Sequence, residues 1–285
     1  MESAARPEDV SLDIDASGVA HVVLQRPQRM NALDGAMFDA ILGVTEHLSA
    51  LPADRLRAVV LSGAGRAFCA GLDTAQFSRL LQGDAAGLDV GQRSGGRVDS
   101  LETRTHGIAN GPQQVVLAWR QLPVPVIAAV HGPVFGGGLQ LALGADLRMA
   151  GRDARLSVME MRWGLVPDMG GMLLLRELLG ADRVRELVYT ARELSADEAC
   201  ALGLVSRVCD DPLAEARALA SEIARQSPQA VRAAKRLLNA AFDGASPAEL
   251  LRAEAREQQA ILGSAEQIET VRARLERRAP NYRLG

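Results

Sequence analysis

The stretch FGGGLQLALGAD, from Phe135 to Asp146, places three consecutive glycines at the entrance of an apolar helix. The segment before it, PVIAAVHG, has the composition of a buried strand. A strand that ends in glycines and leads into a helix presents backbone N–H groups at the positive end of that helix. Such a turn can hold a phosphate or a developing oxyanion. The first polar side chain after the glycines, Gln140, is an amide and carries no charge.

Two familiar phosphate-binding patterns do not fit this stretch. The dinucleotide pattern G-x-G-x-x-G lacks its third glycine and the acidic residue that should follow it. The P-loop pattern fails because no Gly-Lys-Ser/Thr is present. Taken alone, the glycines indicate either a backbone that faces a ligand or a tight turn packed against a neighbouring backbone.

A second glycine-containing loop repeats the same order of elements. RAFCAGLD follows the strand-like segment RAVVLSGAG and leads into a short helix expected near Thr74–Leu81. Two such loops can direct one N–H group each at a single oxygen atom. The pair therefore favours a ligand-facing role for the glycines.

The composition allows a substantial core and argues against several classes of partner. The chain has 285 residues, of which 48% are apolar, so we expect one large domain, or one domain with an appendage. A net charge of −3 and an aromatic content of 3% argue against nucleic acid. No apolar run approaches the ~20 residues of a membrane helix, so we expect no membrane partner.

The cysteines and the first residues favour a cytoplasmic protein. Cys69, Cys200 and Cys209 fit neither a metal-ligand spacing nor a disulfide framework. We therefore expect no metal and a reducing compartment. The opening residues MESAARPEDV are polar and acidic, unlike a signal peptide.

Strand-like and helix-like segments alternate up to about residue 208, which predicts an α/β fold with buried, partly parallel strands. Asn31 or Asp34 is expected to cap the first long helix. The remainder of the chain is almost entirely helical, with Ser227 and Ser246 as N-caps before prolines. We therefore divide the chain into a core, residues 1–208, and a helical appendage, residues 209–285.

The segment from residue 82 to residue 112 has a different character. It is rich in Gly, Asp, Arg and Ser and shows little periodicity. Long loops in compact domains are usually functional or disordered, so this one is a candidate for a functional loop. His106 lies within it and is a minor candidate for a residue that reaches the site.

The two loops and several other segments, in this order, resemble the crotonase, or enoyl-CoA hydratase/isomerase, superfamily. The resemblance extends over about residues 10–280, including the helical tail. It is highly specific for the superfamily and poorly specific for the reaction. The segments that carry it are RPQRMNALD, VVLSGAGRAFCAGLD, PVIAAVHGPVFGGGLQLALGAD, LSVMEMRWGLVPDMGG and LSADEACALGLVSRV.

The resemblance implies an acyl-CoA thioester substrate and an oxyanion hole made of two backbone N–H groups. By position the donors are the backbone N–H groups of Leu72 and Gly137, with Ala70 and Asp73 as substrate contacts beside Leu72. The barrier to removing the weakly acidic α-proton is largely charge on the thioester oxygen. One such donor contributes roughly 3–4 kcal/mol in other enzymes.

The resemblance also points to the proton carriers. Hydratases of this family use two glutamates, and Gln140 stands at the position of the first, while Glu160 stands at the position of the second. Gln140 can orient a water or a substrate but cannot exchange a proton at neutral pH, so the two-glutamate hydratase pair is absent. Asp168 resembles the second catalytic acid of the dienoyl-CoA isomerase branch, although that branch also tends to carry an acid where Gln140 stands.

Simpler structural roles remain open for these side chains. Glu160 could form a surface ion pair with Arg155 or Arg162. Asp168 could be only a helix N-cap. Gln140 could be a hydrogen-bonding spacer. His131 is expected at a packed or hydrogen-bonded strand end rather than as a base.

Basic residues near the two loops are candidates for the CoA phosphates. Arg26 and Arg66 stand where family members often place such residues, and either could instead be a solvated surface charge. Arg232, Lys235 and Arg236 on a C-terminal helix are further candidates. The methionines at 159, 161, 169 and 172 are expected in the core, with one or two lining an acyl pocket.

The sequence thus predicts an acyl-CoA enzyme that needs no separate cofactor and shifts a double bond with Glu160 as base and Asp168 as partner. The alternatives are an enoyl-CoA hydratase and a catalytically silent acyl-CoA binder. The implied fold is a spiral of ββα units forming two roughly perpendicular sheets, followed by a helical trimerisation region. The resemblance implies a homotrimer or a dimer of trimers, and the 82–112 loop implies an unusual or bulky acyl group.

Overall fold

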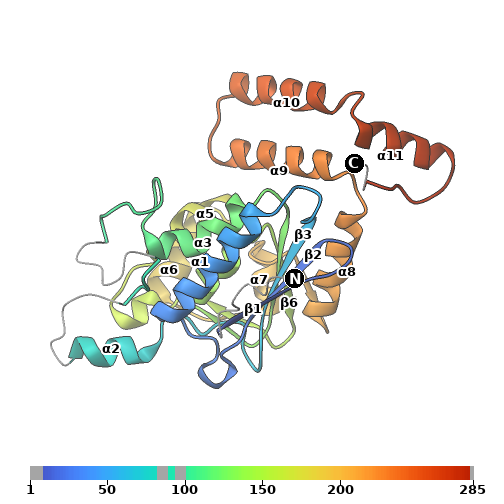
Figure 1. The fold of residues 1–285 in the computed structure, drawn as a ribbon. Helices are drawn as coiled ribbons and strands as arrows, with labels where there is room; N and C mark the ends of the chain where they lie inside the picture. The colour runs from blue at the N-terminus through green and yellow to red at the C-terminus, as the bar shows by residue number, and fades with distance from the viewer. Residues whose placement is uncertain (1–8, 82–88, 94–100, 283–285) are drawn as a thin grey trace.

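The computed structural model describes residues 9–81, 89–93 and 101–282 (Figure 1). The predictions for the first eight residues, and part of the prediction for the 82–112 segment, lie outside these residues. No helix of the described chain is long and apolar enough to span a membrane.

The larger of two sheets has six strands in the order β1-β2-β3-β4-β6-β9. β1 and β2 pair antiparallel through the predicted turn at Gly18, and every later pairing in this sheet is parallel. The strands are β1 (Val10–Ile14), β2 (Val19–Leu24), β3 (Ala58–Gly63), β4 (Val126–Val130), β6 (Leu147–Gly151) and β9 (Arg207–Cys209).

The smaller sheet has three strands in the order β5-β7-β8. They are β5 (Pro133–Phe135), β7 (Arg155–Ser157) and β8 (Leu194–Ser195). β5 pairs parallel with β7, and β7 pairs antiparallel with β8. Since β5 directly precedes the glycines, this sheet fixes where the helix after them begins.

The helices of the core connect these strands, and the short helix predicted near Thr74–Leu81 has those bounds. Asp34, not Asn31, caps the first long helix, and its side chain accepts from the N–H of Met37 at 3.0 Å. The core helices are α1 (Gly35–Ala50), α2 (Thr74–Leu81), α3 (Gly111–Gln121), α4 (Gly137–Leu143), α5 (Gly171–Leu178), α6 (Ala181–Thr190) and α7 (Ala196–Leu202). Two 3-10 helices, η1 (Pro27–Arg29) and η2 (Glu160–Trp163), interrupt the loops.

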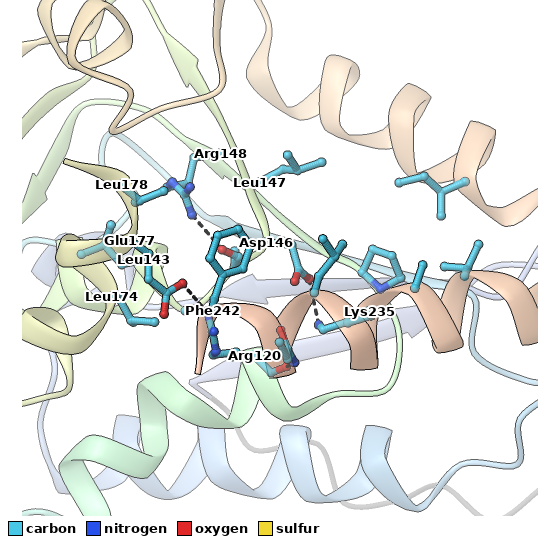
Figure 2. Close-up of a pocket in the computed structure, with 18 of the residues that line it drawn as sticks. Arg120, Leu143, Asp146, Leu147, Arg148, Leu174, Glu177, Leu178, Lys235 and Phe242 are labelled. Atoms are coloured by element: carbon cyan, nitrogen blue, oxygen red, sulfur yellow. Dashed lines mark hydrogen bonds and ion pairs between the residues drawn. The ribbon is translucent and has the colours of Figure 1, made fainter. Parts of the chain in front are cut away.

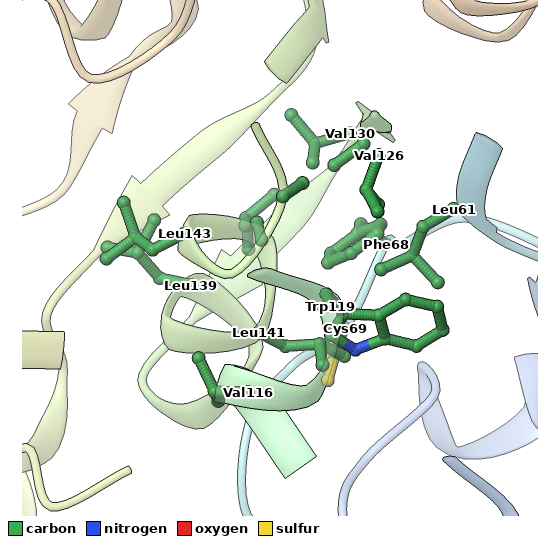
Figure 3. Close-up of a cluster of buried hydrophobic side chains, with 14 of the residues drawn as sticks. Leu61, Phe68, Cys69, Val116, Trp119, Val126, Val130, Leu139, Leu141 and Leu143 are labelled. Carbon is green, nitrogen blue, oxygen red and sulfur yellow. The ribbon is translucent and has the colours of Figure 1, made fainter. Parts of the chain in front are cut away.

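Both faces of the larger sheet are covered, which explains its nearly continuous apolar strands. In β3, Val59 and Leu61 face the main core, while Val60 belongs to a second cluster under α8 (Pro212–Ala224). Figure 3 shows part of the main core, where Leu61, Phe68 and Trp119 lie near the apolar side chains of α4. The helix that follows the glycines is thus anchored by its own buried leucines.

The last three helices form an arm; the first of them packs against the edge of the core through Arg232 and Lys235, and the other two extend away from the sheet body in Figure 1. They are α9 (Pro228–Phe242), α10 (Pro247–Ile261) and α11 (Ala265–Leu275). Ser227 and Ser246 cap α9 and α10 as predicted, each before a proline. The α/β architecture predicted from the sequence is confirmed.

Candidate active site

The first glycine loop lies against the segment before α1. The N–H of Ala70 donates to Met30 O at 3.0 Å, and the N–H of Asp73 donates to Leu33 O at 2.8 Å. Leu33 in turn donates to Gly71 O at 2.7 Å. Leu72 lies between Gly71 and Asp73, the two residues that hydrogen-bond to Leu33 in this parallel bridge. The N–H of Leu72 therefore points away from Leu33. Within the described chain that N–H has no hydrogen-bond acceptor.

Asn31 holds the start of this loop in place, a role that the sequence analysis missed. Its side chain is fully buried, and its amide nitrogen donates to the carbonyl oxygens of Ala64, Ala67 and Phe68 at 2.9 to 3.1 Å. Its amide oxygen accepts from the N–H of Arg26 at 2.8 Å. Asn31 has a positive φ of 53°, which asparagine tolerates better than most residues. That cue, an Asn in a turn near a glycine loop, is too common to identify such a residue.

The second glycine loop begins α4. Phe135 donates its N–H to Cys69 O at 3.1 Å, and Gly136 donates to Ser157 O at 2.9 Å. Gly137 is the first residue of the helix, so its N–H has no partner within the helix. The described residues offer it no other acceptor.

The two loops touch through backbone, and this contact explains the glycines. A Cβ atom on Gly71 would lie 2.6 Å from Phe135 O and 3.5 Å from the nitrogen of Gly137. A Cβ on Gly138 would lie 2.2 Å from Cys69 O. Only glycine permits such approach. The N–H groups of Leu72 and Gly137 are therefore neighbours at one cavity, as an oxyanion hole requires.

This cavity has a volume of about 300 Å³ and predominantly apolar walls. It contains six of the predicted site residues: Ala70, Leu72, Gly137, Gln140, Glu160 and Asp168. Its other walls come from the two glycine loops, from α1, α2 and α3 near their starts, from the segments before α1 and α3, and from the residues between Met159 and Met169. They are Leu33, Phe38, Gly71, Thr74, Val90, Leu101, Pro112, Gly136, Met159, Trp163, Leu165, Val166 and Met169.

Glu160 is the first residue of η2 and is 9% exposed. Its Oε1 accepts from Gln140 Nε2 at 2.7 Å, whereas its Oε2 is buried and has no hydrogen-bond partner in the part of the chain that the structure describes. Burial raises the pKa of this carboxyl; the hydrogen bond from Gln140 opposes that rise, and the charge of Asp168 adds to it. The predicted alternative, an ion pair with Arg155 or Arg162, does not form, because both arginines bind Glu193.

Asp168 lies in the turn that precedes α5. The N-cap of that helix is Gly170, and no side chain caps it, so Asp168 does not play the capping role left open above. Its side chain keeps a face toward solvent, while burial of the rest raises its pKa. The two carboxyls at the cavity thus both bind protons more readily than usual.

Gln140 is 2% exposed and makes three hydrogen bonds. Besides donating to Glu160, it accepts at Oε1 from the N–H groups of Met169 and Gly171, each at 2.9 Å. The two backbone donors identify the oxygen of the amide, since only oxygen can accept from them. Its nitrogen must therefore face Glu160.

Arg26, Arg66 and Asp73, three further predicted substrate contacts, do not line the cavity. Arg26 is 7% exposed, and its guanidinium lies within ion-pair distance of Asp9, Asp34 and Asp73. Asp73 also binds the exposed Arg29 at 2.8 Å. These pairs brace the segments on either side of the first loop, whereas Arg66 is exposed.

The two candidate histidines lie away from the cavity. His131 follows β4, and its Nε2 hydrogen-bonds to Gly65 O at 2.9 Å, as expected for a strand end. His106 contacts Thr105 and borders a separate hollow between α1 and α3. Of the four methionines, Met159 and Met169 line the cavity. No group of three or more His, Cys, Asp or Glu side chains in the described chain is arranged to hold a metal.

A second cavity of about 470 Å³ lies between α9 and the edge of the core (Figure 2). It also contains charges, but they are paired. Lys235 donates to Asp146 at 2.8 Å and to two backbone carbonyls, and Arg120 binds Glu177 at 2.8 Å. Arg148 donates to two further carbonyls. The two carboxylates of this cavity, Asp146 and Glu177, are therefore each paired with a cation.

The family of the chain follows from its sequence as well as from this geometry. The model of the enoyl-CoA hydratase/isomerase family matches residues 15–90 and 84–284. The chain belongs to this family, within the crotonase superfamily, and is an enzyme of that kind acting on acyl-CoA thioesters.

Its relatives carry more than one reaction name. The chain is 34% identical to a Mycobacterium bovis protein named "Probable enoyl-CoA hydratase", over 94% of this chain and 96% of that protein. It is 38% identical to the human mitochondrial Delta(3,5)-Delta(2,4)-dienoyl-CoA isomerase, over 76% of this chain and 64% of that protein. A crystal structure of an enoyl-CoA hydratase from Bacillus anthracis superposes with a TM-score of 0.80 at 28% identity, covering 96% of this chain and 98% of that one. The fold is thus the crotonase fold.

Proposed function

We propose that the protein shifts a double bond in an enoyl- or dienoyl-CoA, with Glu160 and Asp168 as proton carriers. One observation carries the proposal: these are the only carboxylates that line the cavity within the described chain, and the side chain at the position of the first hydratase glutamate is the amide of Gln140. An amide cannot exchange a proton at neutral pH. A double-bond shift moves one proton from carbon to carbon and consumes no water.

The reaction follows from the geometry in two steps. Ionised Glu160 removes a proton from C2 of a 3-enoyl- or 3,5-dienoyl-CoA, and the electron pair delocalises onto the thioester oxygen. The N–H groups of Leu72 and Gly137 stabilise that charge. A proton then returns at C4 of the enoyl chain or C6 of the dienoyl chain, from Asp168 or from Glu160. The product is the 2-enoyl- or 2,4-dienoyl-CoA. If Glu160 returns the proton, it is again ionised for the next turnover; if Asp168 donates it, Glu160 releases its proton and Asp168 regains one, either directly between the two carboxyls or through solvent.

Turnover of three substrates tests the proposal. A 3-enoyl-CoA and a 3,5-dienoyl-CoA should be isomerised, while crotonyl-CoA, a 2-enoyl-CoA, should be hydrated slowly. Rapid loss of crotonyl-CoA absorbance through hydration would overturn the isomerase assignment. Binding of all three without turnover would instead support a catalytically silent binder.

Hydration of 2-enoyl-CoA is the second candidate, supported by the hydratase names among the relatives. Here Glu160 and Asp168 would share the activation of water and the protonation of the α-carbon. The same three substrates decide between the two reactions.

The remaining proposals concern CoA and assembly. Arg66, being exposed, is the better candidate for a CoA phosphate than Arg26, whose charge is already paired. The helical arm is proposed to form a trimer or a dimer of trimers, because its outer surface carries exposed large apolar side chains. Sedimentation or light scattering tests the assembly, and a monomer would overturn it. The exposed large apolar side chains of the arm are Leu238, Phe242, Leu251, Leu262, Ile268, Val271 and Leu275.

A further inference from the structure

The environment of Gln140 differs from that of a substrate contact. It is 2% exposed, and its side-chain oxygen and nitrogen both have protein partners. Those partners come from two segments at the cavity: Glu160 in η2, and the backbone N–H groups of Met169, just before α5, and of Gly171, its first residue. Gln140 therefore connects the two segments that carry the two carboxyls.

The direction of each bond is fixed by chemistry. The N–H groups of Met169 and Gly171 can only donate, so they hold Gln140 Oε1. The amide nitrogen can only donate, so Glu160 Oε1 must accept. A rotated amide would place a donor against two donors and an acceptor against a carboxylate. The arrangement has one stable orientation.

The consequence for Glu160 is that its two oxygens are no longer equivalent. Oε1 is engaged by the amide, while Oε2 is buried and without a partner among the described residues. Asp168 directly precedes Met169 in the chain, and the N–H of Met169 is one of the two donors to Gln140. The side chain of Gln140 therefore fixes the position of Glu160 relative to that of Asp168.

We propose that Gln140 is a positioning residue that holds Glu160 and the Asp168 turn in one frame and leaves Glu160 Oε2 as the atom that accepts the α-proton. The inference rests on the proposed function, because it assumes Glu160 to be the base. It assigns Gln140 no proton and no contact with the reacting carbons. Gln140 thus directs Oε2 of Glu160 toward the substrate.

The charged surroundings of Glu160 make the effect measurable. Asp168 is the charged group that acts on it within the described residues, and Arg162 on the same 3-10 helix is turned to Glu193. A hydrogen bond from the amide stabilises the ionised carboxylate. Loss of that bond should raise the pKa of Glu160 further, because the ionised carboxylate loses the hydrogen bond that opposes the effect of burial.

The test is exchange of the α-protons of octanoyl-CoA in D₂O, which requires a base and an oxyanion hole but no double bond. Gln140→Met keeps the length of the side chain and removes all three hydrogen bonds. We expect kcat for exchange to fall by about tenfold or more, with KM nearly unchanged and the acidic limb of the pH profile moved to higher pH. The control is Gln229→Met, at a half-buried glutamine of α9 that donates to Ala260 O. It should change none of these quantities.

Titration of a ¹³C-labelled Glu160 carboxyl in wild type and Gln140→Met provides a readout independent of turnover. An unchanged kcat and an unchanged Glu160 titration, even with a lower melting temperature, would reduce Gln140 to a structural role and overturn the inference. If Gln140→Met does not fold, Gln140→Asn makes the same test, since its shorter amide cannot span both partners. Failure of the proposed function looks different: wild type and Glu160→Gln would then exchange equally slowly, while the titration still decides the role of Gln140.

Discussion

The cavity between the glycine loops and the cavity beside α9 both have mainly apolar walls, but they differ in how their charged groups are paired. In the cavity between the loops, Glu160 and Asp168 lie beside apolar side chains and their pKa values are raised, and the N–H groups of Leu72 and Gly137 lack acceptors among the described residues. In the cavity beside α9, the cations are bound by carboxylates or carbonyls (Figure 2). The second cavity is the larger, so size does not identify the active site. Among the described residues the carboxyls of the first cavity have no cationic partner, and this, together with two N–H groups without acceptors, marks where a substrate is expected.

The largest effect is expected at Glu160. Glu160→Gln preserves the shape of the side chain but removes the base, so turnover should fall by about 10³-fold. The measurement is isomerisation of a 3-enoyl-CoA. Glu198→Gln, in an exposed ion pair with Arg192, is the matched control and should retain full activity. Equal activity of Glu160→Gln and wild type would remove the catalytic assignment.

The next effect tests the contact between the two glycine loops. Gly71→Ala introduces a methyl group 2.6 Å from Phe135 O at a residue with a φ of +90°. The loops must separate, and the N–H groups of Leu72 and Gly137 lose their common target. Turnover should fall by about 10²-fold or more, comparable to loss of one oxyanion-hole donor. A variant that is folded by circular dichroism and fully active would contradict the oxyanion-hole assignment.

Asp168→Asn separates the two halves of the reaction. Proton removal by Glu160 should persist, so exchange of α-protons with D₂O continues, whereas isomerisation of a 3,5-dienoyl-CoA slows by about 10²-fold. Asp210→Asn, at an exposed aspartate paired with Arg152, serves as control. Unaltered isomerisation would show that Glu160 alone carries the proton between carbons.

The pH dependence gives a smaller, signed effect. Glu160 must be ionised to accept a proton, and burial raises its pKa, so kcat/KM should fall with decreasing pH at values above the ~4.3 of a free glutamate. The charge of Asp168 contributes to that rise. In Asp168→Asn the acidic limb should therefore move to lower pH. Movement to higher pH would contradict the electrostatic coupling of the two carboxyls.

The smallest effect on chemistry is expected in the second cavity. Lys235→Met removes the partner of Asp146 and two hydrogen bonds to carbonyls, and should cost about 2 kcal/mol of unfolding free energy. Denaturant unfolding measures the loss. Activity per folded molecule should stay at the wild-type level. A loss of turnover without a loss of stability would mean that this cavity, too, takes part in catalysis.

Sequence patterns predicted the elements that depend on local rules. Asp34, Ser227 and Ser246 cap helices because a short polar side chain before an apolar helix satisfies its first N–H groups. The family resemblance, rather than any local rule, nominated Leu72 and Gly137. Three-residue strands such as β5 have too few residues to show periodicity, and the sequence analysis did not separate it from the glycines.

The roles that the sequence left open depend on contacts between distant segments. The hydrogen bonds of Gln140 join it to Glu160, 20 residues away, and to Met169 and Gly171, 29 and 31 residues away. Pairing of Arg26 with carboxylates likewise depends on the fold. In the sequence, an arginine near a loop looks the same whether its side chain binds a phosphate or pairs with an aspartate.

The most direct test of the account is a crystal structure with a non-reactive acyl-CoA analogue. The thioester oxygen should lie about 2.7 to 3.1 Å from the nitrogens of both Leu72 and Gly137. The α-carbon should face Glu160 Oε2, with the acyl chain along the apolar wall toward Asp168. An acyl group bound in the cavity beside α9, or a thioester oxygen without contact to either N–H, would contradict the account.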